Sequence, residues 1–177
     1  MKQQRARLFV FIMLCVLMSA NWLTVDRVVA SSTCQCLPFI QSKMGLPATG
    51  NAWFPAYNYP SFLESYKQSG QSGRLVFRVS KVSPSSSKPS DLKSTMMIWQ
   101  PNTKGAYGAG HIAQVISATY DRNAKVWTIE FIDANGWSNS ESTVKETKNE
   151  HGCANVAVRT LKTKSLSGIT FYSIRKR

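Results

Sequence analysis

The chain has 177 residues and carries 22 Lys and Arg side chains against 9 Asp and Glu, which gives a formal net charge of +13. A charge of this size attracts anionic polymers. The sequence has no zinc-finger spacing, no heptad basic region and no aromatic nucleic-acid-binding consensus, so we expect no nucleic-acid partner.

The first 30 residues have the pattern of a secretory signal. Three basic side chains within residues 2–7 precede an unbroken apolar run at residues 8–20. That run is shorter than the roughly 20 residues that a membrane-spanning helix needs, and Val28 and Ala30 fit a cleavage site. We therefore expect a cleaved signal over residues 1–30. An uncleaved anchor is the alternative.

The remaining residues, 31–177, fit one domain, which the signal predicts to be secreted or periplasmic, without a stable membrane anchor. Its charge is still +10, from 18 basic and 8 acidic residues. We expect a monomer whose partners are anionic cell-envelope polymers, to which exposed cations are attracted in a salt-dependent way. Solubility alone is the other explanation of the charge.

In chain order, the pattern predicts helices first and strands afterwards. A short helix is expected within residues 31–45, with Cys36 in its first turn and Gly45 closing it, and a second helix at Pro60–Gln68. Strand patterns follow at Leu75–Val82, Met96–Trp99, His111–Ala118, Val126–Ile132, Ala154–Leu161 and Ile169–Ile174. This order predicts an α+β domain, with the cysteine-bearing helix packed on a mostly antiparallel sheet of about five to six strands.

The cysteines suggest a nucleophile. Residues 31–177 contain Cys34, Cys36 and Cys153, and in an oxidising compartment an odd number leaves one thiol unpaired. A thiol at a helix N-terminus faces the positive end of the helix dipole, which lowers its pKa. Cys36 is predicted to occupy that place. The alternative is an inert buried cysteine.

A base and an orienting group follow later in the chain. His111 comes directly after a Gly-rich turn and begins an apolar strand, where it could serve a helix-borne thiol as base. Asp133 and Asn135 share one face of a later strand, and either could hold the imidazole in its productive tautomer. The simpler readings are a structural histidine and an ordinary turn that ends in Gly136.

These segments resemble the CHAP domain, the cysteine, histidine-dependent amidohydrolase/peptidase. The resemblance covers Cys34 to Ile174 and rests on five segments in the family's order: Cys36-Leu37-Pro38-Phe39-Ile40, Met44-Gly45-Leu46-Pro47, Gly50-Asn51-Ala52-Trp53, Gly110-His111-Ile112-Ala113-Gln114-Val115 and Ile132-Asp133-Ala134-Asn135.

The resemblance implies a papain-like (NlpC-type) fold and hydrolysis of amide bonds in peptidoglycan, either as a cysteine peptidase or as an N-acetylmuramoyl-L-alanine amidase. Its implied catalytic residues are Cys36 as nucleophile, His111 as base, Asp133 as the residue that orients His111, and Asn135 in support. Gln35 would help to stabilise the oxyanion, and Trp53 and Trp137 are the expected substrate-binding residues. No cofactor and no metal are expected.

Three features depart from the family pattern. The glycine that commonly opens the strand before the histidine is absent, and Ser94 or Thr95 stands in its place. Asp133 is one methylene shorter than the more usual glutamate, so the orienting role could pass to Asn135. The polar segment Ser138–Glu150 has no counterpart that we can place.

Other arrangements of the cysteines lead to other functions. If Cys36 stays reduced, Cys34 and Cys153 remain to form a disulfide, although both could also stay reduced. Together with His151, the three cysteines could instead ligate a structural zinc, but one residue between paired ligands is closer than zinc sites prefer. A catalytically silent wall-binding module of the same fold is the third possibility.

Overall fold

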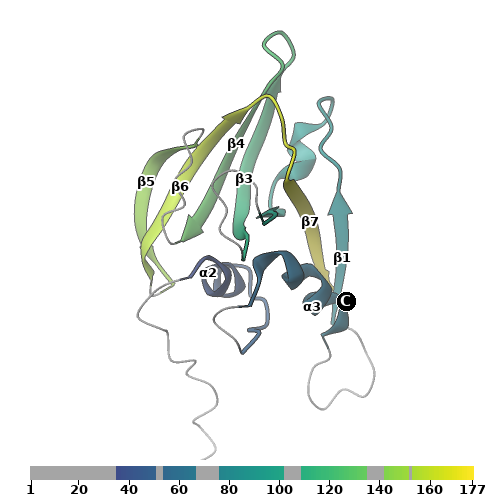
Figure 1. Cartoon of the computed structure of the whole chain (residues 1–177), viewed down its shortest axis with the longest axis vertical. Helices are drawn as coiled ribbons and strands as arrows, with labels where there is room; N and C mark the ends of the chain where they lie inside the picture. The colour runs from purple at the N-terminus through teal and green to yellow at the C-terminus, as the bar shows by residue number, and fades with distance from the viewer. Residues whose placement is uncertain (1–34, 51–53, 67–75, 102–108, 135–141, 152) are drawn as a thin grey trace, which may run out of the picture. The chain divides into compact units, whose positions relative to one another are not determined.

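Antiparallel strands dominate the computed structural model, which describes residues 35–50, 54–66, 76–101, 109–134, 142–151 and 153–177. One sheet has the strand order β1-β7-β2-β3-β4-β6-β5 (Figure 1). Its strands are β1 (Phe77–Val82), β2 (Met96–Trp99), β3 (His111–Asp121), β4 (Val126–Ala134), β5 (Ser142–Glu150), β6 (Cys153–Thr163) and β7 (Ile169–Lys176). All six predicted strands are present.

Helices form a small part of the described chain. They are α2 (Cys36–Lys43), α3 (Tyr59–Ser65) and the 3-10 turns η1 (Ala56–Asn58) and η2 (Pro89–Leu92). Helix α2 packs against β3 and β4, and α3 packs against β1. No helix within the described ranges is long and apolar enough to cross a membrane.

The predicted fold class is wrong. We expected a papain-like α+β domain with a helix on five to six strands, whereas the described residues form a predominantly antiparallel sheet of seven strands with two short α-helices. The missed strand is β5, within the polar segment that had no counterpart in the family pattern. Most of its residues are exposed because it lies at the edge of the sheet, so it lacks the apolar alternation that marks a half-buried strand.

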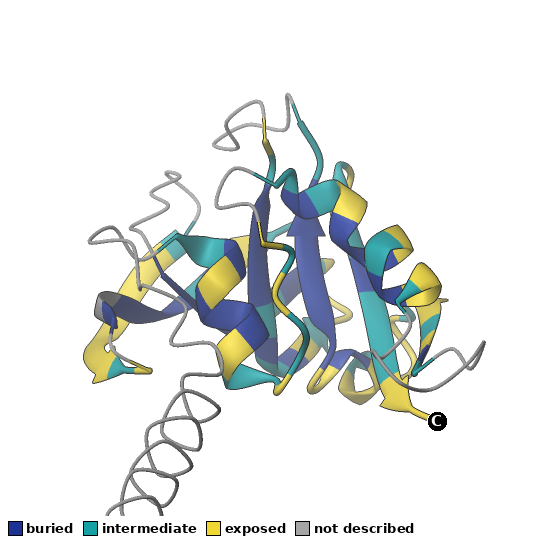
Figure 2. Ribbon diagram, turned by 90° about the horizontal axis from the view of Figure 1, so that it is seen from below, coloured by how far each residue is buried: buried dark blue, intermediate teal, exposed yellow. Residues whose placement is uncertain are grey.

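The sheet separates two hydrophobic cores, and neighbouring residues of β2 point into opposite ones. Met96 and Ile98 join a core with residues of α2 and α3. Met97 and Trp99 join a second core, which also contains Leu92 of η2. Because strand side chains alternate between faces, β2 is buried throughout, and Figure 2 shows buried strands at the centre of the sheet.

The strand before the histidine begins without a glycine. Ser94 adopts a φ of 62°, in the left-handed region that usually favours glycine. The Ser94 amide donates a hydrogen bond of 2.9 Å to the carbonyl of Val115 in β3, which fixes this turn against the sheet. The turn before β2 is therefore formed by a serine in the left-handed conformation.

Candidate active site

Cys36 is the first residue of α2, as the sequence predicted. Gln35 precedes the helix in extended conformation and is half-buried. Leu37 and Ile40 anchor the helix in the core with at most 3% exposure. Gly45 ends it with a φ of 62°, the common left-handed conformation after a helix. The cysteine is thus held at the helix N-terminus, while Cys36 itself remains partly exposed and carries a free thiol.

His111 enters β3 through a backbone turn that only glycine accommodates well. Gly110 has a φ of +73°, and a Cβ atom on it would lie 2.6 Å from the backbone oxygen of Trp99. That residue is the direct partner of His111 in the β2–β3 register. The preceding carbonyl, of Ala109, accepts a hydrogen bond of 2.9 Å from the Ala56 amide of η1. Both sides of the turn are therefore fixed.

The imidazole of His111 belongs to a buried relay of charged groups. Its Nε2 lies 2.8 Å from Oδ2 of Asp133 in β4. The second oxygen of that carboxylate, Oδ1, accepts a hydrogen bond of 3.0 Å from Nε of Arg159 in β6. Asp133 is fully buried, and His111 and Arg159 are 6% and 5% exposed. Since Nε2 is held by Asp133, the ring presents Nδ1 to Cys36, with which it is hydrogen-bonded.

This arrangement shifts protons from the thiol toward the imidazole. Burial raises the pKa of Cys36, but the hydrogen bond and charge of His111, together with the backbone amide of Ile112, outweigh it and lower that pKa overall. Burial lowers the pKa of His111, but hydrogen bonds to Asp133 and Cys36 and the charges of both raise it to about 9. Both shifts favour the charged forms of the pair, a thiolate beside an imidazolium.

Trp99 covers the imidazole from β2. The centroids of the Trp99 and His111 rings are 5.3 Å apart at an interplanar angle of 52°. The ring of Phe131 also packs on the indole, with its centroid 5.3 Å from that of Trp99. Trp99 is 1% exposed. The indole therefore limits water on this side of the ring and restricts its rotation, which strengthens the bond to Asp133 in a low dielectric.

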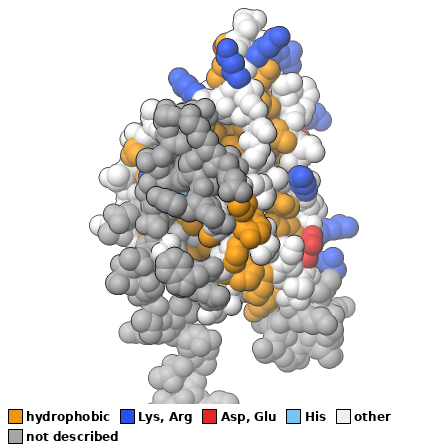
Figure 3. Space-filling model, viewed as in Figure 1, with side chains coloured by type: hydrophobic (Ala, Val, Ile, Leu, Met, Phe, Trp, Pro, Cys, Tyr) orange, Lys and Arg blue, Asp and Glu red, His pale blue; other side chains and the backbone are white. Residues whose placement is uncertain are grey.

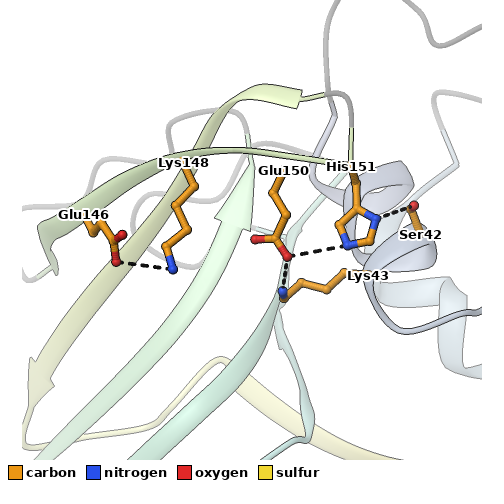
Figure 4. Close-up of polar contacts among 6 residues, drawn as sticks. All are labelled: Ser42, Lys43, Glu146, Lys148, Glu150 and His151. Carbon is orange, nitrogen blue, oxygen red and sulfur yellow. Dashed lines mark hydrogen bonds and ion pairs between the residues drawn. The ribbon is translucent and has the colours of Figure 1, made fainter.

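A second polar cluster ties the end of α2 to the turn between β5 and β6 (Figure 4). Ser42 Oγ lies 3.0 Å from His151 Nδ1, and Nε2 of the same ring lies 3.5 Å from Glu150. Glu150 also pairs with Lys43. The ring of Phe39 packs edge-on to His151 at 6.0 Å. These contacts hold the helix that carries Cys36 against the outer strands.

One ligand of the zinc alternative, Cys34, lies outside the described residues. Cys36 bonds to His111, whereas Ser42 and Glu150 contact the two ring nitrogens of His151. Within the part of the chain that the structure describes, no group of three His, Cys, Asp or Glu side chains could hold a metal ion.

Several predicted site residues lie outside the described residues. They are Cys34, Trp53, Asn135 and Trp137. Cys153 is described: it begins β6 and is buried. Its disulfide with Cys34, and the roles of Asn135 and the two tryptophans, stay predictions. The structure brings together Cys36, His111 and Asp133, and Gln35 precedes Cys36 in the chain.

The sequence reasoning missed Arg159 and Trp99. A signal for Arg159 was present, because it is the single charge within the apolar run Ala154–Leu161, and a buried arginine needs a partner. Trp99 gave no such signal, since an aromatic residue at the end of an apolar strand is ordinary core.

Comparisons with family models, with curated proteins and with solved structures find no match to this chain.

Proposed function

We propose that this protein is an exported cysteine hydrolase that cleaves amide bonds of bacterial peptidoglycan. The observation that carries the chemistry is the buried relay in which Asp133 holds His111 and His111 holds the thiol of Cys36. Thiol-based acyl transfer requires a nucleophile that contacts a base, and a carboxylate that orients the base.

The proposed reaction has two stages. The Cys36 thiolate attacks the carbonyl carbon of the amide, and the imidazolium of His111 protonates the departing amine as the C–N bond breaks. This leaves a thioester and a neutral imidazole. His111 then removes a proton from water, the hydroxide attacks the thioester, and the acid product leaves as the thiolate re-forms and the proton stays on His111. Asp133 stabilises the imidazolium at each end of the cycle.

The negative oxygen that develops during attack needs hydrogen-bond donors. The Cys36 amide lies in the first turn of α2, where backbone amides have no partner within the helix. Gln35, immediately before it, is our candidate for the side-chain donor. Donors preset around a developing charge contribute a large share of the rate in acyl transfer.

The choice of peptidoglycan rests on the sequence. The predicted secretory signal, the resemblance to the CHAP domain and the net positive charge all favour a substrate in the bacterial envelope. Figure 3 gives a surface view consistent with an anionic matrix, because Lys and Arg outnumber Asp and Glu among its coloured side chains. Arg78 and Lys81 of β1 and Lys176 of β7 are among the exposed cations.

The test is hydrolysis of purified sacculi, followed by mass analysis of the released fragments. We expect Cys36→Ser and His111→Ala each to lose at least about 10³-fold in rate, because each removes a group that acts on the substrate carbonyl. Lys162→Ala is the control, since this side chain of β6 is exposed, and it should retain activity. Hydrolysis by Cys36→Ser at the wild-type rate would eliminate the proposal.

The orienting role is tested by a second pair of variants. Asp133→Ala should cost less activity than His111→Ala, because the thiolate and imidazole can still react slowly without the carboxylate. Asn135→Ala should cost less again. If Asn135→Ala is the more damaging of the pair, the two roles are exchanged.

A further inference from the structure

Arg159 is a charged side chain in the interior of the sheet. It lies in β6 between Val158 and Thr160, is 5% exposed, and contacts Asp133 rather than solvent. Burying a guanidinium is costly unless a partner compensates the lost hydration. The hydrogen bond to Oδ1 supplies that compensation, and the same carboxylate holds His111 through its other oxygen.

The strand register explains how Arg159 reaches this carboxylate. Asp133 stands directly opposite Ala157 in the β4–β6 ladder, and Arg159 stands opposite Phe131. Arg159 is therefore the diagonal neighbour of Asp133 on the same face of the sheet, a separation that a long side chain can bridge. With one partner on each oxygen, the Asp133 carboxylate cannot rotate freely.

Arg159 also balances charge. When Cys36 is a thiolate and His111 an imidazolium, their charges and those of Asp133 and Arg159 sum to zero. After His111 has given its proton to the leaving amine, Asp133 would be an unpaired buried anion if Arg159 were absent. The proposed proton transfers do not involve Arg159, so its guanidinium remains the partner of the carboxylate throughout the proposed cycle.

We propose that Arg159 is a positioning residue, which fixes the carboxylate of Asp133 so that its second oxygen aligns His111 with Cys36. The inference rests on the proposed function, because alignment matters only if Cys36 is the nucleophile. Among the described residues, the charged groups that act on Cys36 are His111 from β3 and Asp133 from β4, and Arg159 from β6 acts through Asp133.

The experiment measures the rate of Cys36 alkylation by iodoacetamide as a function of pH, on the folded protein and without any substrate. Arg159→Met removes the charge at similar length, and we expect the midpoint of reactivity to move to higher pH by about one unit, since Asp133 then no longer holds His111 in alignment with the thiolate. Arg159→Lys should restore most of the wild-type profile. Lys162→Met is the matched control, because it removes an exposed cation from the same strand and should leave the midpoint unchanged.

A double variant separates positioning from folding. Circular dichroism identifies conditions in which each variant is folded. The double variant, Asp133→Asn combined with Arg159→Met, removes both buried charges together. If Arg159 acts through Asp133, Arg159→Met produces no further midpoint shift in the Asp133→Asn background. A folded Arg159→Met protein with the wild-type midpoint, or an equal shift in both backgrounds, overturns the inference.

The outcomes also distinguish this inference from the proposed function. If the wild-type protein leaves sacculi intact, the proposed substrate is rejected. If the alkylation midpoint of Arg159→Met is nevertheless shifted, the role of Arg159 is supported. Normal hydrolysis with an unshifted midpoint would reject the role of Arg159 alone.

Discussion

Replacing Gly110 with alanine tests whether the turn before His111 is as constrained as its geometry indicates. The backbone has a φ of +73°, and the added Cβ would lie 2.6 Å from the carbonyl oxygen of Trp99. The left-handed conformation costs an alanine roughly 1–2 kcal/mol, and forcing an atom into a packed site costs about 1–3 kcal/mol more. We therefore expect a loss of roughly 2–5 kcal/mol in the free energy of unfolding.

Gly45→Ala is the matched control. Gly45 has a φ of +62°, but a Cβ atom on it would meet nothing within 4 Å. This variant should lose only the conformational part, roughly 1–2 kcal/mol. With a urea m-value of about 2 kcal/mol/M, the midpoint of unfolding should fall by about 1–2.5 M for Gly110→Ala and by about 0.5–1 M for Gly45→Ala.

The assay is urea unfolding followed by circular dichroism, combined with alkylation of Cys36 in the native protein. Because the Trp99 carbonyl would have to move and Trp99 pairs with His111 in the sheet, Gly110→Ala should also slow alkylation at pH 7, whereas Gly45→Ala should not. Equal losses of stability in the two variants, with equal thiol reactivity, would refute the steric argument.

Three further predictions concern protonation and covalent structure. Cys36→Ser should lower the pKa of His111 from about 9, because the negative charge of Cys36 is lost while the hydrogen bond and charge of Asp133 remain. NMR titration of the imidazole measures this, and an unchanged value would contradict the Cys36 contact. Glu150→Gln should cost under about 1 kcal/mol at pH 7, since its ion pair with Lys43 is partly exposed. The hydrogen bond from Lys43 lowers the pKa of Glu150 from 4.5. The stabilisation by this ion pair is therefore present above pH 4.5 and is lost as the pH falls through the lowered pKa of Glu150 in the folded protein. The free energies of unfolding of wild type and Glu150→Gln, measured by denaturant titration across that range, should converge at low pH. Thiol counting on the denatured, unreduced mature protein should find one free thiol at Cys36 if Cys34 and Cys153 are bridged, and three free thiols would reject the bridge.

Local patterns in the sequence located most of the secondary structure. The apolar spacing of Leu37 and Ile40 placed α2, and Gly45 marked its end. Short apolar runs separated by turn residues marked six strands. β5 was missed because an edge strand with mostly exposed side chains has no hydrophobic period, and its pairing with β6 is a long-range property. The predicted fold class failed for this reason, together with the shortness of both helices.

The sequence by itself determined which residue types were available for chemistry: a cysteine at the start of a helix, a histidine after glycine, and a carboxylate at the end of a strand. Only the tertiary structure decided that Asp133 meets His111 and that Arg159 holds the other carboxylate oxygen. These contacts join β3, β4 and β6, whose register depends on hydrogen bonds between segments far apart in the chain. Burial then strengthens the interactions between these charges, because the same groups in water would interact weakly.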